Sequence, residues 1–161
     1  MDHNYLDHVA LATGRLMGNL RSLEWMVRNV LYLVKHPPHT EMPQPRMLFD
    51  AKVGDTFPLN ALTSYDSLAQ LIAAYNATAA TKIPVSLVTV RDTLAHGRTL
   101  GRDDSVTRLS LMKFTNPKHT ETEVRVSVRC ELTREWLDEQ IALADEALGT
   151  VIARYRELGG T

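Results

Sequence analysis

The chain has 161 residues, and we expect residues 1–161 to form a single domain with a substantial hydrophobic core. Its hydrophobic share of 44% and charged share of 23% exclude wholesale disorder. The formal net charge of −1 excludes a uniformly basic nucleic-acid binder, so contact with RNA would require a local basic patch.

The N-terminal residues and the single cysteine bear on where the protein works. The segment MDHNYLDHVA has no basic stretch followed by an apolar one, so we expect no signal peptide. No apolar run approaches the ~18 residues that span a bilayer. Cys130 has no partner for an internal disulfide, which fits a reducing compartment. Together these features predict a cytoplasmic protein without a membrane partner.

The first predicted element is a long amphipathic helix over Leu6–Val34. Its stripe, which includes one polar residue, advances in steps of three and four through positions 6, 9, 13, 16, 20, 23, 27, 31 and 34. Gly14 and Gly18 are either tolerated surface positions or a place where a second helix approaches closely. A helix of this length, ~45 Å, suits a bundle or a dimer seam.

A proline-rich connecting loop follows over about residues 36–63. His36-Pro37-Pro38 ends the helix, because proline lacks an N–H and disfavours helix in the residue before it. Apolar residues predict that the loop docks in part on the domain. They are Met47, Leu48, Phe49, Phe57, Leu59 and Leu62.

Two shorter helices are predicted next. Thr63 or Ser64 would cap the second helix, over Asp66–Ala79. Pro84 favours the first turn of a third helix, which ends near Ala95 with Gly97 as its stop. The buried face of the second helix would consist of Leu68, Leu71, Ile72 and Tyr75.

The spacing of the apolar residues then changes from the helical three or four to every second residue. Apolar residues alternate with polar ones over Val124–Glu131, and turn residues at 116–119 separate this strand from Ser105–Phe114, so we expect a β-hairpin. Thr133 caps a final helix that ends near Leu158. Its stripe would be Leu137, Ile141, Ala144, Leu148, Val151 or Ile152, Tyr155 and Leu158. The predicted fold class is mainly all-α, a bundle of four to five helices with a β-hairpin inserted before the last helix.

The stretch Pro84–Gly101 carries the strongest candidate chemistry. Arg91-Asp92 interrupts an apolar helical surface, and His96 arrives just before Gly97. The spacing from arginine to histidine is a weak signal by itself. Its place at the end of a helix within a predicted bundle is what singles it out.

The sequence Arg91-Asp92-Thr93-Leu94-Ala95-His96-Gly97 resembles the signature of the HEPN superfamily (higher eukaryotes and prokaryotes nucleotide-binding domains), an arginine and a polar residue followed after three residues by histidine. The long first helix and the helical bundle resemble that family over most of the chain. Its members are commonly metal-independent endoribonucleases that act as dimers with both motifs in a shared cleft, often in toxin–antitoxin or phage-defence systems. The resemblance implies Arg91 and His96 as the catalytic pair, RNA as the substrate, no cofactor, a homodimer, and an antitoxin or regulatory protein as a further partner.

Two positions depart from the family pattern. Asp92 fills a slot that is often asparagine, and Arg98 stands where toxins partnered by minimal nucleotidyltransferases carry tyrosine, which argues against that subgroup. Some family members keep the fold without nuclease activity. The alternative function is therefore a non-catalytic helical dimer that binds a nucleotide, RNA or a protein.

The residue types also fit RNA cleavage through the 2′-hydroxyl without the resemblance. Histidine titrates near neutral pH and suits proton transfer, whereas the planar, charged fork of arginine suits phosphate oxygens. Residues five apart on a continuous helix lie ~140° apart around its axis. The site therefore needs either a helix break at Ala95-His96-Gly97 or a partner chain.

Neighbouring charged residues extend the candidate site. Asp92, Arg98 and Arg102 are candidates for binding RNA or phosphate, with Arg108 beyond them. The alternative is a solvated helix end followed by a charged loop, because nearby aspartates offset the arginines.

Residues outside this stretch are weaker candidates. Arg28 and Asn29 of the first helix are candidates to reach the cleft. His36 and His39 have a spacing found among metal ligands, but no further ligand completes a site, so we expect no metal.

Overall fold

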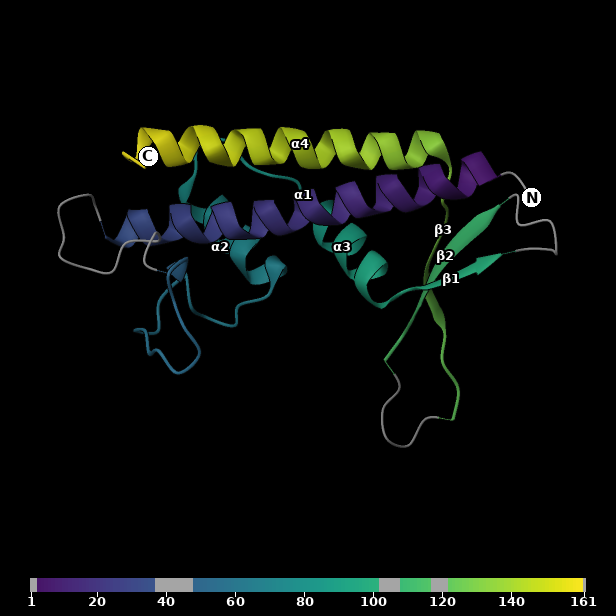
Figure 1. The fold of residues 1–161 in the computed structure, drawn as a ribbon, viewed down its shortest axis with the longest axis horizontal. Coiled ribbons are helices and arrows are strands. Elements are labelled where there is room, and N and C mark those ends of the chain that lie inside the picture. Colours follow the sequence, from purple (N-terminus) through teal and green to yellow (C-terminus); the bar gives the residue numbers. More distant parts are fainter. Residues whose placement is uncertain (1–2, 37–47, 102–107, 117–121, 161) are drawn as a thin grey trace. The chain divides into compact units, whose positions relative to one another are not determined.

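The computed structural model describes residues 3–36, 48–101, 108–116 and 122–160. Its elements, shown in Figure 1, are α1 (His3–Lys35), α2 (Leu68–Thr78), α3 (Ser86–His96), β1 (Arg98–Gly101), β2 (Leu109–Phe114), β3 (Val126–Glu131) and α4 (Arg134–Glu157). The three strands form one antiparallel sheet in the order β1-β2-β3. The protein is therefore mainly helical with a small sheet, as the sequence predicts in outline.

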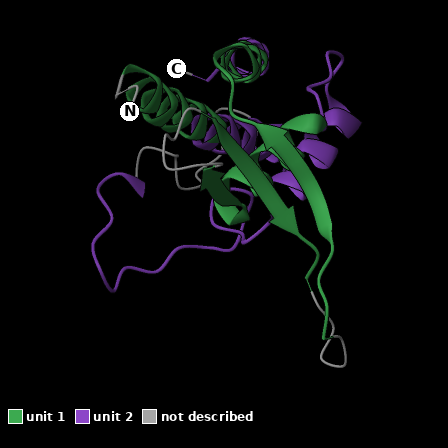
Figure 2. Cartoon of the chain, turned by 90° about the vertical axis from the view of Figure 1, so that its right-hand side faces the viewer, with its two compact units in different colours: residues 1–20, 86–145 green, residues 21–85, 146–161 purple. Residues whose placement is uncertain are grey.

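The chain divides into two compact units, and the long helices α1 and α4 contribute to both (Figure 2). Unit 1 contains residues 1–20 and 86–145, and unit 2 contains residues 21–85 and 146–161. The sheet and α3 belong to unit 1, whereas α2 belongs to unit 2.

In unit 1, the beginnings of α1 and α4 are joined by polar contacts. Tyr5 of α1 donates a hydrogen bond to the carbonyl of Leu132, just before α4, and accepts one from the amide of Leu109 on β2. Farther along both helices, Asp145 accepts hydrogen bonds from Arg15 at 2.9 Å and from Asn19 at 2.6 Å. These contacts fix α1 and α4 in a parallel arrangement within this unit.

The buried face of α1 confirms the prediction over most of its length and departs from it near the end. Val30 and Leu33 are buried, whereas Leu31, which was expected in the stripe, is half-buried and Val34 is exposed. The cause is tertiary, because Leu62 of the connecting segment packs with Leu33 in one cluster. The expected stripe is buried at Val9, Leu16, Leu20, Leu23 and Val27.

The helix α2 has the predicted buried face but a different start. Leu68, Leu71, Ile72 and Tyr75 are all buried. Its N-cap is Ser67, which forms a capping box with Gln70, so the predicted caps at Thr63 and Ser64 were wrong. The hydroxyl of Ser64 instead donates a hydrogen bond to Asp66 at 2.6 Å, within the segment that precedes the helix.

The connecting segment docks only in part. Leu62 is buried and Leu48 and Phe57 are half-buried, but Phe49 and Leu59 are exposed. Phe49 nevertheless makes an edge-on contact with the Trp25 ring of α1, at 6.1 Å between centroids. Met47 lies outside the described residues.

The sheet contains the predicted hairpin, formed by β2 and β3, and one strand that the sequence analysis missed. That strand is β1, where a charged loop was expected; Arg98 pairs with Met112 and Thr99 with Leu111. Leu111, which is 2% exposed, marks the covered face of the sheet. Val124 and Val126 are about half exposed, and within the predicted alternation only Val128 and Cys130 are half-buried.

The helix α4 begins and ends as predicted. The Thr133 hydroxyl accepts a hydrogen bond from the Trp136 amide, and Gly159 ends the helix with φ of 82°. The amides of Gly159 and Gly160 donate to earlier carbonyls in the pattern of a Schellman motif. Ala147, and not the predicted Leu148, is fully buried.

Gly97 directly follows α3 at a position that has no room for a side chain. A Cβ at this position would lie 2.3 Å from the Thr93 carbonyl oxygen and 2.9 Å from a Leu111 methyl. We expect Gly97→Ala to lower the free energy of unfolding by ~1–3 kcal/mol, measured by urea denaturation. Gly14→Ala is the matched control, because open space surrounds Gly14 in α1 and the change should stabilise by ~0.5–1 kcal/mol. Equal effects of the two substitutions would contradict this account of Gly97.

Candidate active site

The helix α3 holds the predicted motif without a break. It is helical from Ser86 through His96, and the Gly97 amide donates to the Thr93 carbonyl at 2.7 Å. Of the two alternatives, a helix break or a partner chain, the first does not release the histidine, because His96 is still the last residue of the helix. Leu87 and Thr93 are buried and fix which side of α3 faces the core of unit 1.

Arg91 and His96 lie at opposite borders of the exposed side of α3. His96 is exposed, and the Arg91 side chain is 36% exposed. At 100° per residue, His96 lies ~140° from Arg91 around the axis, with Ala95 and Asp92 between them. Within one chain the two side chains therefore do not converge on a single point.

Asp92 lies between two cations. Its carboxylate accepts from Nη1 of Arg91 at 3.0 Å, and its second oxygen lies 3.7 Å from Nζ of Lys113 on β2. All three side chains are about one third exposed. Asp92, predicted as a binding residue, would itself repel phosphate, so its chemical contribution is to orient the two cations.

Lys113 is the residue of this cluster that the sequence analysis missed. It lies two residues after the buried Leu111 along β2 and shares its face, so it points to the covered side of the sheet, where α3 lies. In the sequence, the alternation along the strand indicates only which face Lys113 occupies. It does not identify Asp92 as its partner.

The other predicted binding residues are dispersed. Arg98 is exposed on β1, with its guanidinium 5.5 Å from the centre of the Phe114 ring. Arg108, also exposed, precedes β2 at the end of the strand pair remote from Arg98. Arg102 lies outside the described residues. The structure thus brings Arg91, Asp92 and Lys113 together. His96 and Arg98 follow shortly after Asp92 in the sequence but lie at the surface, outside this cluster.

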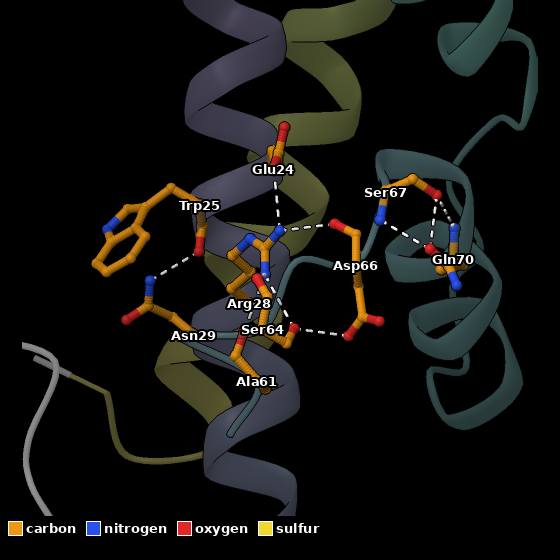
Figure 3. A network of polar contacts seen from close by, with 9 residues as sticks. All are labelled: Glu24, Trp25, Arg28, Asn29, Ala61, Ser64, Asp66, Ser67 and Gln70. Atoms are coloured by element: carbon orange, nitrogen blue, oxygen red, sulfur yellow. Dashed lines mark hydrogen bonds and ion pairs between the residues drawn. The ribbon is translucent and has the colours of Figure 1, made fainter. Parts of the chain in front are cut away.

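Arg28 and Asn29 do not reach a cleft, contrary to expectation. Both are buried in unit 2, and Figure 3 shows the polar network around them. The Arg28 guanidinium donates to the carbonyls of Ala61, Ser64 and Asp66 at 2.7–3.2 Å and to Glu24 at 3.1 Å. Asn29 donates to the carbonyl of Trp25. These side chains hold the connecting segment on α1, which is a structural task.

A cavity of about 440 Å³ opens in unit 2. Its walls come from the end of α1, the segment at 59–66 and α2, and they include Tyr32, Lys35, His36, Asp66 and Gln70. None of the residues predicted as catalytic or RNA-binding lines it.

Cys130 is a packed thiol. Burial raises the pKa of the Cys130 thiol above its ordinary value, which keeps the unreactive protonated form dominant to higher pH. We expect iodoacetamide at pH 8 to alkylate the native protein about tenfold more slowly than the same chain in denaturant. Equal rates would show that the thiol is accessible and ionised in the folded protein.

The described residues contain neither a metal-ligand cluster nor a helix that could cross a membrane. No group of three or more His, Cys, Asp or Glu side chains there is placed to hold a metal ion, and His39 falls outside the described ranges. None of the described helices is long and apolar enough to cross a membrane. Comparisons with models of protein families, with curated proteins and with solved structures each give no match for this chain.

Proposed function

We propose that this protein is a cytoplasmic, metal-independent endoribonuclease of the HEPN type that acts as a homodimer in a toxin–antitoxin or phage-defence setting. One observation carries the proposal: a mainly helical chain presents Arg91 and His96 along the exposed side of α3. Arg91 is accompanied by Asp92 and Lys113, and the three side chains form a small charged cluster beside the middle of the helix.

The reaction assigns one role to each member of the pair. His96 accepts the proton of the ribose 2′-hydroxyl while the 2′-oxygen attacks phosphorus. The bond from phosphorus to the 5′-oxygen breaks, and the imidazolium returns the proton to that leaving oxygen. Arg91 stabilises the charge on the phosphorane with its planar fork. The products are a 2′,3′-cyclic phosphate and a 5′-hydroxyl.

The angle between the two side chains is the reason for a dimer. Arg91 and His96 of one α3 border the same exposed side but lie too far apart around the axis to act on one phosphate. The small Ala95 lies between them and leaves room for a second α3. A twofold axis parallel to the two packed helices would place Arg91 of one protomer on the same side of the seam as His96 of its partner, twice in each dimer.

The test uses wild-type protein in EDTA with two substrates of one sequence, RNA and its fully 2′-O-methylated analogue. We expect the RNA to be cut to fragments with cyclic phosphate and 5′-hydroxyl ends, and the methylated analogue to stay intact, because it lacks the attacking hydroxyl. Cleavage of both substrates, or of RNA only when a metal ion is added, would contradict the mechanism. Binding of RNA without any cleavage would favour the alternative, a non-catalytic RNA-binding module.

A further inference from the structure

The sheet of unit 1 has one face turned away from its core. Cross-strand partners share a face, so Leu111, which is buried, and Lys113, which reaches Asp92 of α3, define the covered side. The intervening residues of the three strands define the outer face. These residues are Arg98, Leu100, Ser110, Met112, Phe114, Arg129 and Glu131, and a shift of register between Lys113 and Phe114 brings Val126 opposite Phe114.

The outer face combines positive charge with flat apolar side chains. Arg98 and Arg129 are both exposed and both pair with Met112, one from each side, while Glu131 is the one carboxylate among the face residues. Arg98 also lies over the Phe114 ring. The face is thus locally cationic in a chain whose net charge is −1, which favours a polyanion as its partner.

We infer that this outer face binds single-stranded RNA by stacking unpaired bases on Phe114 and on the Arg98 and Arg129 guanidinium planes. Aromatic rings and guanidinium groups on a sheet are a common platform for unpaired bases, whereas a duplex hides its base faces. The half-exposed Leu100 and Val126 extend the apolar area beside the ring. A second copy of the same face is disfavoured, because its arginines would oppose these two.

This inference rests on the proposed function, and the position of the outer face adds the class of RNA that the site would take. A single residue, Gly97, separates His96 from Arg98 at the start of β1. RNA that runs from the outer face past the start of β1 would therefore reach His96 as a single strand. The substrate class is an unpaired segment of RNA, such as a loop or an end.

The test is fluorescence anisotropy with a labelled unstructured 12-nucleotide RNA and with the same strand in a duplex, using His96→Ala protein so that the RNA stays intact. We expect the single strand to bind more tightly than the duplex. Phe114→Leu should weaken single-strand binding about tenfold. Arg129→Gln should weaken it severalfold and lower the slope of log Kd against log salt by about 0.7. Arg156→Gln, an exposed arginine of unit 2, is the control and should leave binding unchanged.

Unchanged affinity in both sheet variants overturns the inference, whether or not wild type cuts RNA. Equal affinity for the duplex also overturns it. Because Arg129 is exposed and Phe114 is half-buried, thermal melts of both variants separate a loss of binding from a loss of fold. If single-strand binding depends on these residues but the protein cuts no RNA, the result would support RNA binding by this face and contradict the proposed endonuclease activity.

Discussion

Replacing His96 with alanine should lower the rate of RNA cleavage by ~10²–10⁴-fold, because the proton acceptor for the 2′-hydroxyl is lost. Replacing Arg91 with alanine should lower it by ~10²–10³-fold through loss of charge stabilisation on the phosphorane. Neither change should shift the melting temperature by more than a few degrees, since His96 is exposed and Arg91 is paired only at the surface. The measurement is single-turnover cleavage of a labelled RNA in EDTA.

Matched controls separate the contribution of Arg91 and His96 to cleavage from the general effect of losing an arginine charge or a histidine ring. Arg21→Ala removes an exposed arginine of α1, and His36→Asn removes a histidine that packs on Tyr32 in unit 2. Both should cut RNA at the wild-type rate. An active His96→Ala protein, or controls as impaired as the motif variants, would remove Arg91 and His96 from the mechanism.

Replacing Arg28 with alanine should destabilise the protein by ~3–5 kcal/mol. Arg28 is 8% exposed as a residue, and its guanidinium donates to three carbonyl groups that lose this donor in the alanine variant. Arg28→Lys should recover only part of the loss, because one ammonium cannot reproduce the two-armed contact. The measurement is urea denaturation followed by circular dichroism.

Arg21→Ala is again the matched control, since it makes the same substitution in the same helix at an exposed position. It should change the free energy of unfolding by no more than ~0.5 kcal/mol. If Arg28→Ala and Arg21→Ala unfold at the same urea concentration, then the polar network in Figure 3 does not hold the connecting segment on α1.

Helices with a strong local pattern were predictable from the sequence. The four buried residues of α2 follow from their spacing alone. Thr133 and Gly159 mark the ends of α4 through capping interactions that involve only residues near them in the sequence. The end of α1 was not predictable, because the burial of Leu33 depends on Leu62, which lies far along the chain. The start of α2 was misplaced for a similar reason: three nearby hydroxyl residues each fit a cap, and only the fold selects Ser67.

The strand β1 was missed because it carries no burial pattern. It has only four residues and all of them are exposed, so no alternation marks it. Its position is set by pairing with β2. The same limitation applies to the site, where Arg91 and Asp92 are visible in the sequence but Lys113 enters only through the sheet.

The measurement that tests the central claim most directly is a mixing experiment with two inactive proteins. Arg91→Ala and His96→Ala proteins are combined in equal amounts, unfolded and refolded together, and assayed for RNA cleavage. If each site joins Arg91 of one protomer to His96 of its partner, half of the dimers are mixed and each mixed dimer has one intact site. The mixture should then show about one quarter of the wild-type activity. A mixture as inactive as its two components would contradict a site shared between protomers.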